Sequence, residues 1–401
     1  MRRNIAIAQE LAGATPSSIL LIAGAREAAL FTLPAATDTL ALPALSKDLT
    51  GAYRSRSLGL PLEQIVRLRA HTLCAALAAF EPDVLIVDKL PSGVEHELTH
   101  SFGLLEAMGT RLVLGLREVL DEPERVRAEW EDVDAMAILR RHYHAVWVYG
   151  DRNVFDPVAE YGIPHDVAQM VRYSGYIDRL AGDRTIEQAA RRRRELELPD
   201  GHLSVCLVGG GEDGYRLADA FARSRLPEGS TGLVVTGPFM PESEQAALTA
   251  LARERTDLRV MGFLPDADTL IWQADEIISM GGYNTSCEIL ACGKRALIVP
   301  RVRPRREQLI RAERLSALGA VDLLEPDALS ADALSAWLAA GPRRPDTLRH
   351  PIDMGGLRRL PAMLDEVLRP GGPCGASGGA AEESRRRVLF RRRAVAASVP
   401  A

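Results

Sequence analysis

The sequence predicts an α/β protein with two Rossmann-like domains, each built around a parallel sheet. Apolar runs of strand length alternate with amphipathic helical stretches along most of the chain, as in strands joined by crossover helices. Several of these runs end in glycine-rich or polar turns before the next helical stretch. The length of 401 residues also exceeds what one hydrophobic core usually organises. We therefore expect two domains in succession.

The first domain is assigned to residues 1–165 and begins in a helix rather than in a strand. Ile5, Ala8 and Leu11 fall on one helical face. Buried strands and one long amphipathic helix follow. The predicted strands are 19–24, 39–42, 83–88, 111–116 and 145–149, and the long helix is 62–80.

The second domain is assigned to residues 166–345, after a loop-like run over 150–163. The alternation of strands and helices restarts there. The strand at 203–208 runs into Gly209, Gly210 and Gly211, which form either a plain turn or a turn at the ligand-binding edge of the sheet. The predicted strands are 171–176, 203–208, 232–236, 258–261, 276–279 and 296–299.

The composition excludes several classes of protein. With 47% hydrophobic and 26% charged residues and a net charge of −5, the chain is globular and has no general affinity for nucleic acid. Its five cysteines include no Cys-x-x-Cys pair, which argues against a disulfide scaffold or a cysteine-rich zinc module. No apolar run approaches ~18 residues and no signal-peptide pattern is present, so we expect a cytoplasmic protein without a transmembrane segment.

The stretch 277–290 is the strongest candidate for a binding site. A strand ends at a glycine pair, which lets the backbone approach a bound group, and a helix then begins with N–H groups and a positive dipole end that favour an anion such as a diphosphate. A carboxylate about one turn further could accept two hydrogen bonds from a ribose. The alternative is an ordinary helix start with Ser/Thr caps and an exposed Glu. The residues concerned are Gly281, Gly282, Asn284, Thr285, Ser286 and Glu288.

A basic loop follows the strand at 296–299. Arg301, Arg303, Arg305 and Arg306 precede Glu307-Gln308 and a helical stretch. Four arginines near a diphosphate could neutralise its charge and stabilise it as a leaving group. The other interpretation is a solvated arginine loop.

These motifs together resemble the nucleotide-sugar site of the GT-B glycosyltransferases. The likeness lies in 280–290, Gly293, Val299-Pro300-Arg301 and Glu307-Gln308. It is greatest to predicted bacterial glycosyltransferases related to family 28, which includes the N-acetylglucosaminyltransferase of peptidoglycan synthesis. The resemblance implies two domains facing a cleft, with the donor in the second domain and the acceptor in the first. It also implies transfer of a hexose-type sugar from a nucleotide donor, of the UDP type, to an acceptor hydroxyl.

The resemblance further implies residue roles. Phe263 or Leu264 would lie near the base, although Phe263 could instead belong to the core, and Glu307 and Gln308 would face the hydroxyls of the donor sugar. We expect no metal, because the helix end and the arginines can do the work of a cation, and no cofactor. The predicted donor-binding residues are Gly209, Gly210, Gly211, Phe263, Leu264, Gly281, Gly282, Asn284, Thr285, Ser286, Glu288, Arg301, Arg305, Glu307 and Gln308.

Both ends of the chain depart from the pattern. Relatives open with a strand, a Gly-rich turn and a histidine thought to be the catalytic base, and their residues just beyond that histidine resemble Arg2–Ala6 here. We hypothesise that the start codon is assigned too late, so that the first strand and the base lie upstream of Met1; an in-frame stop directly before Met1 would contradict this. Residues 346–369 are expected to form a helix packing back on the first domain. Residues 370–401, rich in Gly, Ala, Ser and Arg, are predicted as a disordered tail with possible peripheral membrane contact.

Other functions remain open at this point. A UDP-sugar 2-epimerase or a non-catalytic nucleotide-sugar-binding protein could share the fold, and the acceptor could be a sugar, a lipid-linked molecule or a small molecule. A remote alternative is a zinc peptidase, because His96-Glu97-Leu98-Thr99-His100 matches the His-Glu-x-x-His pattern. That alternative requires both histidines on one face of a helix, with Glu97 free to activate water.

Overall fold

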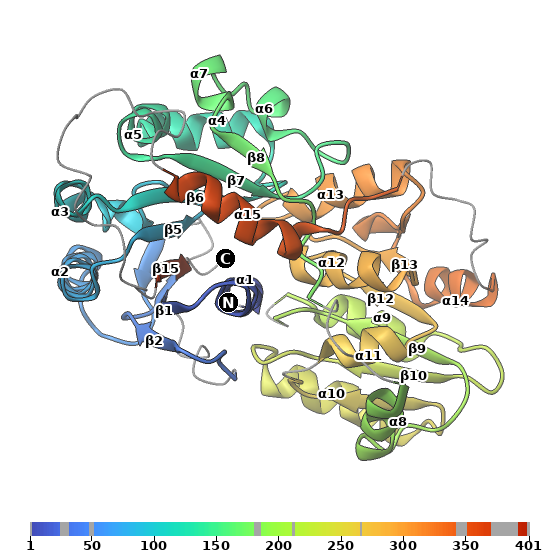
Figure 1. The fold of residues 1–401 in the computed structure, drawn as a ribbon. Coiled ribbons are helices and arrows are strands. Elements are labelled where there is room, and N and C mark those ends of the chain that lie inside the picture. Colours follow the sequence, from blue (N-terminus) through green and yellow to red (C-terminus); the bar gives the residue numbers. More distant parts are fainter. Residues whose placement is uncertain are drawn as a thin grey trace. The chain divides into compact units, whose positions relative to one another are not determined.

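The computed structural model describes residues 2–24, 32–47, 52–179, 186–210, 213–264, 267–341, 351–369 and 392–398. The chain divides into two compact units (Figure 1). The first unit comprises Met1–Arg152, Asp156–Ile177 and Gly355–Ala401, and the second comprises Asn153–Phe155 and Asp178–Met354. Within the described ranges, no helix is long and apolar enough to cross a bilayer.

The first unit contains a seven-stranded sheet with the order β2-β1-β15-β5-β6-β7-β8, and all its neighbouring strands are parallel. Continuous apolar runs form its inner strands, which are buried on both faces as expected for a parallel sheet. The strands are β1 (Ser17–Ala23), β2 (Thr37–Ala41), β5 (Val84–Asp88), β6 (Arg111–Arg117), β7 (Ala145–Tyr149), β8 (Val171–Tyr173) and β15 (Arg392–Ser398). A short antiparallel pair, β3 (Leu45–Lys47) and β4 (Tyr53–Ser55), stands apart from it.

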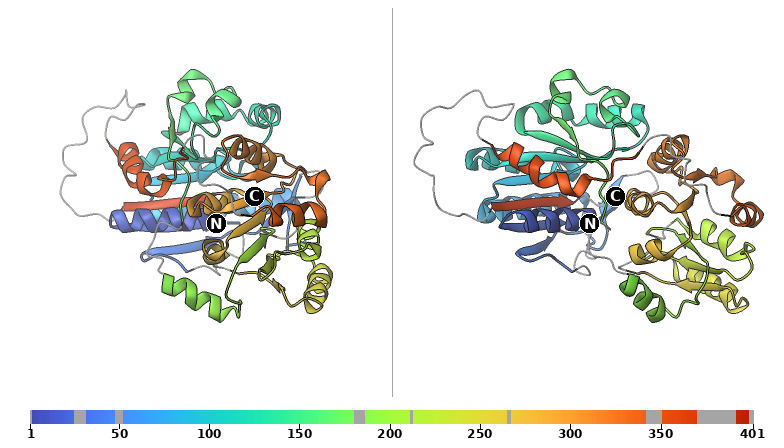
Figure 2. Two further views of the ribbon diagram at one scale, coloured as in Figure 1. Left: turned by 90° about the vertical axis from the view of Figure 1, so that its right-hand side faces the viewer. Right: turned by 45° about the vertical axis from the view of Figure 1, so that its right-hand side comes forward.

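β15 corrects the prediction that the whole of 370–401 is disordered. Arg392–Ser398 forms a strand at the centre of the first sheet, between β1 and β5. Figure 2 shows this strand, in dark red, running beside helix α1 (Arg2–Ala14). The composition of the segment does not indicate a strand, because Ala-rich sequence has little strand propensity of its own. β15 forms because it pairs with a neighbouring strand on each side.

Helices connect the strands of the first unit. α1 packs against β1, β15 and α15 (Gly356–Leu368), so the chain returns to the first unit after the second is complete. The others are α2 (Leu62–Phe80), α3 (Phe102–Met108), α4 (Pro123–Asp132), α5 (Ala135–His142), α6 (Pro157–Glu160) and α7 (His165–Ala168), with 3-10 turns η2 (Val94–His96) and η3 (Thr99–Ser101).

The second unit contains a six-stranded parallel sheet with the order β11-β10-β9-β12-β13-β14. From β9 the chain winds outward through β10 to β11; it then returns to β12, beside β9, and winds the other way. The strands are β9 (Leu203–Leu207), β10 (Thr231–Val235), β11 (Leu258–Met261), β12 (Glu276–Ser279), β13 (Arg295–Ile298) and β14 (Asp322–Leu323). Its helices are α8 (Ile186–Glu195), α9 (Tyr215–Arg223), α10 (Glu242–Arg253), α11 (Ala267–Gln273), α12 (Tyr283–Cys292), α13 (Glu307–Ala317) and α14 (Ala331–Ala339), with the turn η4 (Pro326–Ala328).

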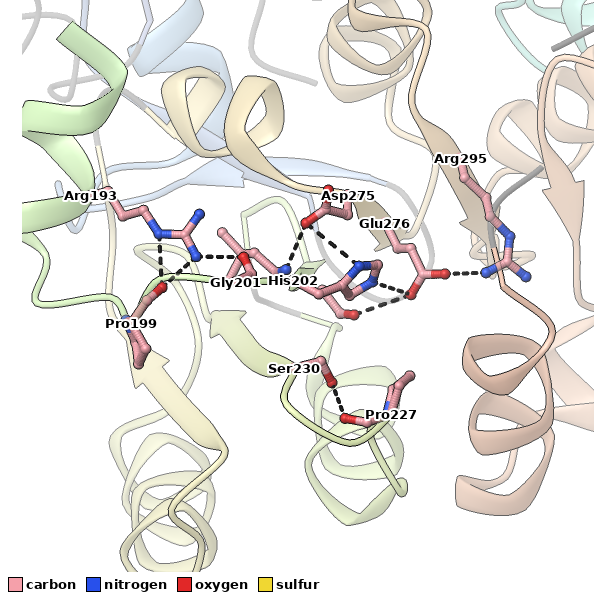
Figure 3. Close-up of polar contacts among 11 residues, drawn as sticks. Arg193, Pro199, Gly201, His202, Pro227, Ser230, Asp275, Glu276 and Arg295 are labelled. Atoms are coloured by element: carbon pink, nitrogen blue, oxygen red, sulfur yellow. Dashed lines mark hydrogen bonds and ion pairs between the residues drawn. The ribbon is translucent and has the colours of Figure 1, made fainter. Parts of the chain in front are cut away.

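The amino edge of this second sheet is tied together by a buried acid (Figure 3). Glu276, the first residue of β12, is 1% exposed and forms an ion pair with Arg295 at the start of β13. Its other carboxylate oxygen accepts a hydrogen bond from Ser204 Oγ at 3.2 Å and lies 3.3 Å from His202 Nε2. Three adjacent strands are therefore joined at the edge opposite the one to which the glycine turns belong.

Candidate functional site

The candidate site lies where the winding of the second sheet reverses. β9 and β12 are neighbours, and each runs at its carboxyl end into one of the predicted glycine turns, Gly209-Gly210 and Gly281-Gly282. In open α/β sheets this reversal leaves a crevice in which ligands bind. The loop carrying Arg301 leaves the same edge from β13, the other neighbour of β12. Because β9, β12 and β13 are parallel neighbours, the two glycine turns and the Arg301 loop lie at the same edge of the sheet.

The turn between β12 and α12 requires glycine at its first position. Gly281 has φ +73°, and a Cβ there would stand 2.6 Å from Ile298 Cγ2. Arg311, buried in α13, donates to the Gly281 carbonyl at 3.3 Å and holds the turn from behind. Gly282 has an ordinary φ of −59° and no atom within 4 Å of an added Cβ. The space beside Gly282, at the start of α12, is therefore open.

The N-terminus of α12 is built to accept hydrogen-bonding partners from outside the helix. Gly282 is the N-cap and offers no capping side chain, and the first bond of the helix runs from Ser286 N to Gly282 O at 2.9 Å. The N–H groups before Ser286 consequently have no acceptor within the helix. Ser286 itself is 2% exposed, and its Oγ has no hydrogen-bond partner among the described residues. Asn284 and Thr285, also predicted here, are half-buried.

Glu288 is held in a way the sequence does not predict. Its side chain is buried and forms an ion pair with Arg179, a residue of the same unit that precedes α8. Arg179 carries no motif and no helical or strand periodicity, so nothing in the sequence singles it out. The exposed carboxylate expected in the alternative interpretation of the helix start is excluded by this burial. The proposed contact with a ribose stays a prediction.

The basic loop is organised around Arg301. Its backbone N–H donates to Gln308 Oε1 at 2.8 Å, and its guanidinium donates to Glu307 Oε1 at 2.8 Å and to Asp213 Oδ2 at 3.3 Å. Burial lowers the pKa of Arg301, but the charges of Glu307 and Asp213 outweigh it, so the pKa is raised and the cation is retained. Within the part of the chain that the structure describes, Arg301 Nε and Glu307 Oε2 are both buried without a hydrogen-bond partner. Such orphaned polar atoms are costly in a folded protein unless a ligand or water satisfies them.

The remaining predicted residues are spread along the edge. Gly210 O accepts a hydrogen bond from Phe239 N at 2.8 Å, and a Cβ on Gly237 would stand 2.3 Å from Gly209 O, so this turn packs tightly on the loop after β10. Gly211 lies outside the described residues. Phe263 and Leu264 are half-buried after β11, two strands away from β9, and Arg305 is half-buried in the basic loop.

The zinc-peptidase alternative does not fit the first unit. His96 and His100 belong to separate 3-10 turns rather than to one helix, because Glu95 and His96 have positive φ. Glu97 is buried, and its two carboxylate oxygens accept from Arg69 Nε and Nη2 at 2.5 and 2.8 Å. Among the described residues, no three His, Cys, Asp or Glu side chains are grouped to hold a metal. The His-Glu-x-x-His pattern is therefore a chance match, and its Glu97 forms an ion pair with Arg69.

Comparison with protein families finds a match over part of the chain. Residues 220–350 match the glycosyltransferase family 28 C-terminal domain. The chain is 30% identical over 165 residues to a UDP-N-acetylglucosamine--N-acetylmuramyl-(pentapeptide) pyrophosphoryl-undecaprenol N-acetylglucosamine transferase of Anaplasma marginale (strain St. Maries), covering 41% of this chain and 40% of that protein. It is 32% identical over 131 residues to the protein of that name from Burkholderia pseudomallei (strain 668), covering 32% and 34%. The chain therefore spans less than half the length of these relatives.

Solved structures share the fold over nearly the whole chain. The calicheamicin glycosyltransferase CalG4 has a TM-score of 0.59 at 14% identity, covering 92% of this chain and 95% of that one. A glycosyltransferase from Rickettsia africae ESF-5 has a TM-score of 0.53 at 14% identity, covering 92% and 94%. A putative UDP-N-acetylglucosamine 2-epimerase from Listeria monocytogenes has 0.59 at 13% identity, covering 92% and 95%. The chain thus has the fold of the GT-B glycosyltransferases, and residues 220–350 of its second unit match the C-terminal domain of glycosyltransferase family 28.

Proposed function

We propose that this protein transfers a hexose-type sugar from a nucleoside diphosphate donor, UDP in particular, to the hydroxyl of an acceptor. The observation that carries the proposal is the open N-terminus of α12 at the point where the second sheet reverses, with the Ser286 hydroxyl buried beside it and unsatisfied. A diphosphate could supply acceptor oxygens to N–H groups of the first turn of α12 and to the Ser286 hydroxyl. The family 28 match over the same residues supports the assignment.

The departing diphosphate gains negative charge as the glycosidic bond breaks. The positive end of the α12 dipole and the guanidinium of Arg301 can stabilise that charge in a site held by protein rather than by water. Asp213 and Glu307 fix the orientation of the Arg301 guanidinium. Its Nε has no acceptor among the described residues and can donate to the diphosphate. Glu307 Oε2, equally unsatisfied, can accept a hydrogen bond from a hydroxyl of the donor sugar. The group that takes the proton from the acceptor is not assigned.

The names of the sequence relatives favour a lipid-linked acceptor, and with it a place at the cytoplasmic surface of a membrane. One stretch of the first unit, residues 54–68, has exposed side chains that suit such contact. Leu58 and Leu60, in the loop before α2, and Leu68 on α2 are each more than 40% exposed. Arg54, Arg56 and Arg67 are exposed in the same stretch of chain. Apolar side chains beside cations are the combination that binds anionic lipid surfaces.

Two measurements on the full chain test the proposal. Calorimetric titration should give saturable binding of UDP, and binding of ADP should be weaker. With a panel of UDP-sugars and acceptors, including lipid-linked saccharides, UDP release should depend on the acceptor. Release of an altered sugar without acceptor would point to an epimerase instead, and affinity without turnover in any mixture would point to a binding protein. No binding of any nucleotide would overturn the proposal.

Arg301 offers a sharper test with a matched control. Arg301→Gln should weaken UDP binding by roughly 1.5–3 kcal/mol, the range for a lost charged hydrogen bond. Binding of uridine, which has no phosphate, should be unchanged. Arg303→Gln alters an exposed arginine of the same loop and should leave both affinities as they are. Equal effects of the two substitutions on UDP would show that only the overall charge of the loop matters.

A further inference from the structure

The centre of the first sheet depends on a strand from the far end of the chain. β1 pairs with β15 from Ser17 to Ala23, and β15 pairs on its other side with β5. In the sheet order, β15 is the strand that stands between β1 and β5. If β15 left, both would present unpaired N–H and C=O groups in the middle of the sheet, where burial makes them costly.

β15 is a core strand and not a loosely attached edge. Val395 is completely buried, and Ala394 is 4% exposed. In register, Val395 lies between Leu20 of β1 and Leu85 of β5. α1 packs against β15. The strand is thus held by two ladders of hydrogen bonds and by a helix.

β15 also lies where the strand order of the first sheet reverses. β1 and β2 lie outward on one side of it and β5 to β8 on the other, so β15 occupies the reversal point of this sheet, where open α/β folds bind ligands. The strand ends beside the carboxyl end of β5, since Ala397 pairs with Val87. There Asp88 accepts a 2.6 Å ion-paired hydrogen bond from Arg3 of α1.

From these observations we infer that the seam between β1 and β5 is a strand-binding site, and that residues 392–398 are its occupant in the working protein. The segment completes the first sheet from a distant part of the sequence and supports the Arg3–Asp88 pair at the ligand edge. The inference goes beyond the proposed function, because it would hold for any ligand of the first unit.

Hydrogen exchange of the full chain tests the inference directly. Backbone amides of 394–398 should exchange as slowly as those of β5, because both form ladder hydrogen bonds within one sheet. Exchange of 394–398 at the rate of an unstructured chain, with β1 and β5 still protected, would overturn it.

A pair of Ala→Asp variants adds a second readout. Ala394→Asp places a carboxylate in the buried centre of the seam, whereas Ala41→Asp places it at an exposed position on the edge strand β2. We expect Ala394→Asp to raise exchange in β1, β5 and β15 together, by on the order of tenfold or more. Ala41→Asp should leave all three unchanged. If Ala394→Asp has no effect on β1 and β5, the seam does not depend on the segment. Should that variant fail to fold, exchange in the unmodified chain still decides.

Discussion

Arg179 and Glu288 form a buried ion pair within the second unit, with side chains 11% and 3% exposed. Glu288 lies one turn into α12, and Arg179 comes from the segment that opens the unit. A buried carboxylate of this kind stays charged only because a cation accompanies it. The pair therefore holds a carboxylate within the helix that is proposed to bind the diphosphate, about one turn past the start of that helix.

Replacing Glu288 tests whether that carboxylate contacts a ribose. Glu288→Gln should lower the affinity for UDP by roughly 1.5–3 kcal/mol, because a hydrogen bond to a charged group is lost. The loss should disappear with 2′,3′-dideoxy-UDP, which has no hydroxyls for the carboxylate to accept from. Calorimetry of both proteins with both ligands gives the comparison. The same loss with both ligands would mean that Glu288 acts only by positioning Arg179 and α12.

A substitution at Gly282 should affect binding without affecting folding. Its φ of −59° suits any residue, and an added Cβ meets no atom within 4 Å, so Gly282→Ala should keep or slightly raise the melting temperature. The methyl group would project into the open space at the start of α12 and should weaken UDP binding by about tenfold, or ~1.4 kcal/mol. Titration and thermal unfolding of one protein sample measure both. Undiminished affinity would place the ligand elsewhere.

Gly281 should show the opposite behaviour. Gly281→Ala combines a φ of +73° with a Cβ only 2.6 Å from Ile298 Cγ2, so the variant should be markedly less stable. Gly293→Ala is the matched control, because Gly293 has φ +59° but open space around its Cβ. The difference in unfolding free energy between the two variants measures the clash alone. Equal losses would mean that Ile298 can move aside.

The buried acid at the amino edge should matter for stability and not for binding. Glu276→Ala leaves Arg295 buried without its carboxylate partner, although Arg295 still donates to Trp337 O at 2.6 Å. Breaking a buried pair in this way costs roughly 3–5 kcal/mol. Chemical unfolding should report that loss, while the UDP affinity of the folded fraction should match the parent. Glu254→Ala, at an exposed position, is the control; reduced affinity in the Glu276 variant would contradict the separation of the two edges.

His144 should give the first unit an acid sensitivity. Burial, and then the charge of Arg111, lowers the pKa of His144 from 6.5 to about 4. Its Nδ1 accepts the N–H of Leu112 at 3.1 Å, which requires the neutral ring. Between pH 6.5 and about 4, His144 binds a proton in the unfolded chain but not in the folded chain. The free energy of unfolding therefore decreases as the pH falls through this range, and His144 does not affect it at higher pH. His144→Gln should flatten that slope in urea unfolding series, and an unchanged slope would assign it to other groups.

Much of the fold can be predicted because buried parallel strands are conspicuous in sequence. Val84–Asp88 and Ala145–Tyr149 are continuous apolar runs, and the predicted strands agree with their observed bounds to within a residue. Arg392–Ser398 escapes prediction because its strand character comes from its two neighbours and not from its alanines. The two-residue strand β14 escapes it for the same reason.

The site is predictable where backbone geometry dictates residue type. Gly281 and Gly209 both have positive φ, which glycine adopts without strain, and each follows a strand. Partnerships between distant side chains carry no such signal. Neither the pairing of Arg179 with Glu288 nor that of Arg301 with Asp213 is marked by spacing or periodicity, because the partners of each pair lie far apart in the chain. Only the three-dimensional structure joins them.

The place of β15 bears on the order in which the protein is made. A ribosome releases every residue of the second unit before it releases the strand that closes the first sheet. During synthesis the second unit can therefore fold while β1 and β5 still lack the neighbouring strand that β15 supplies. The amino-terminal half of this polypeptide is then the last to mature, which exposes it longest to chaperones and proteases in the cell.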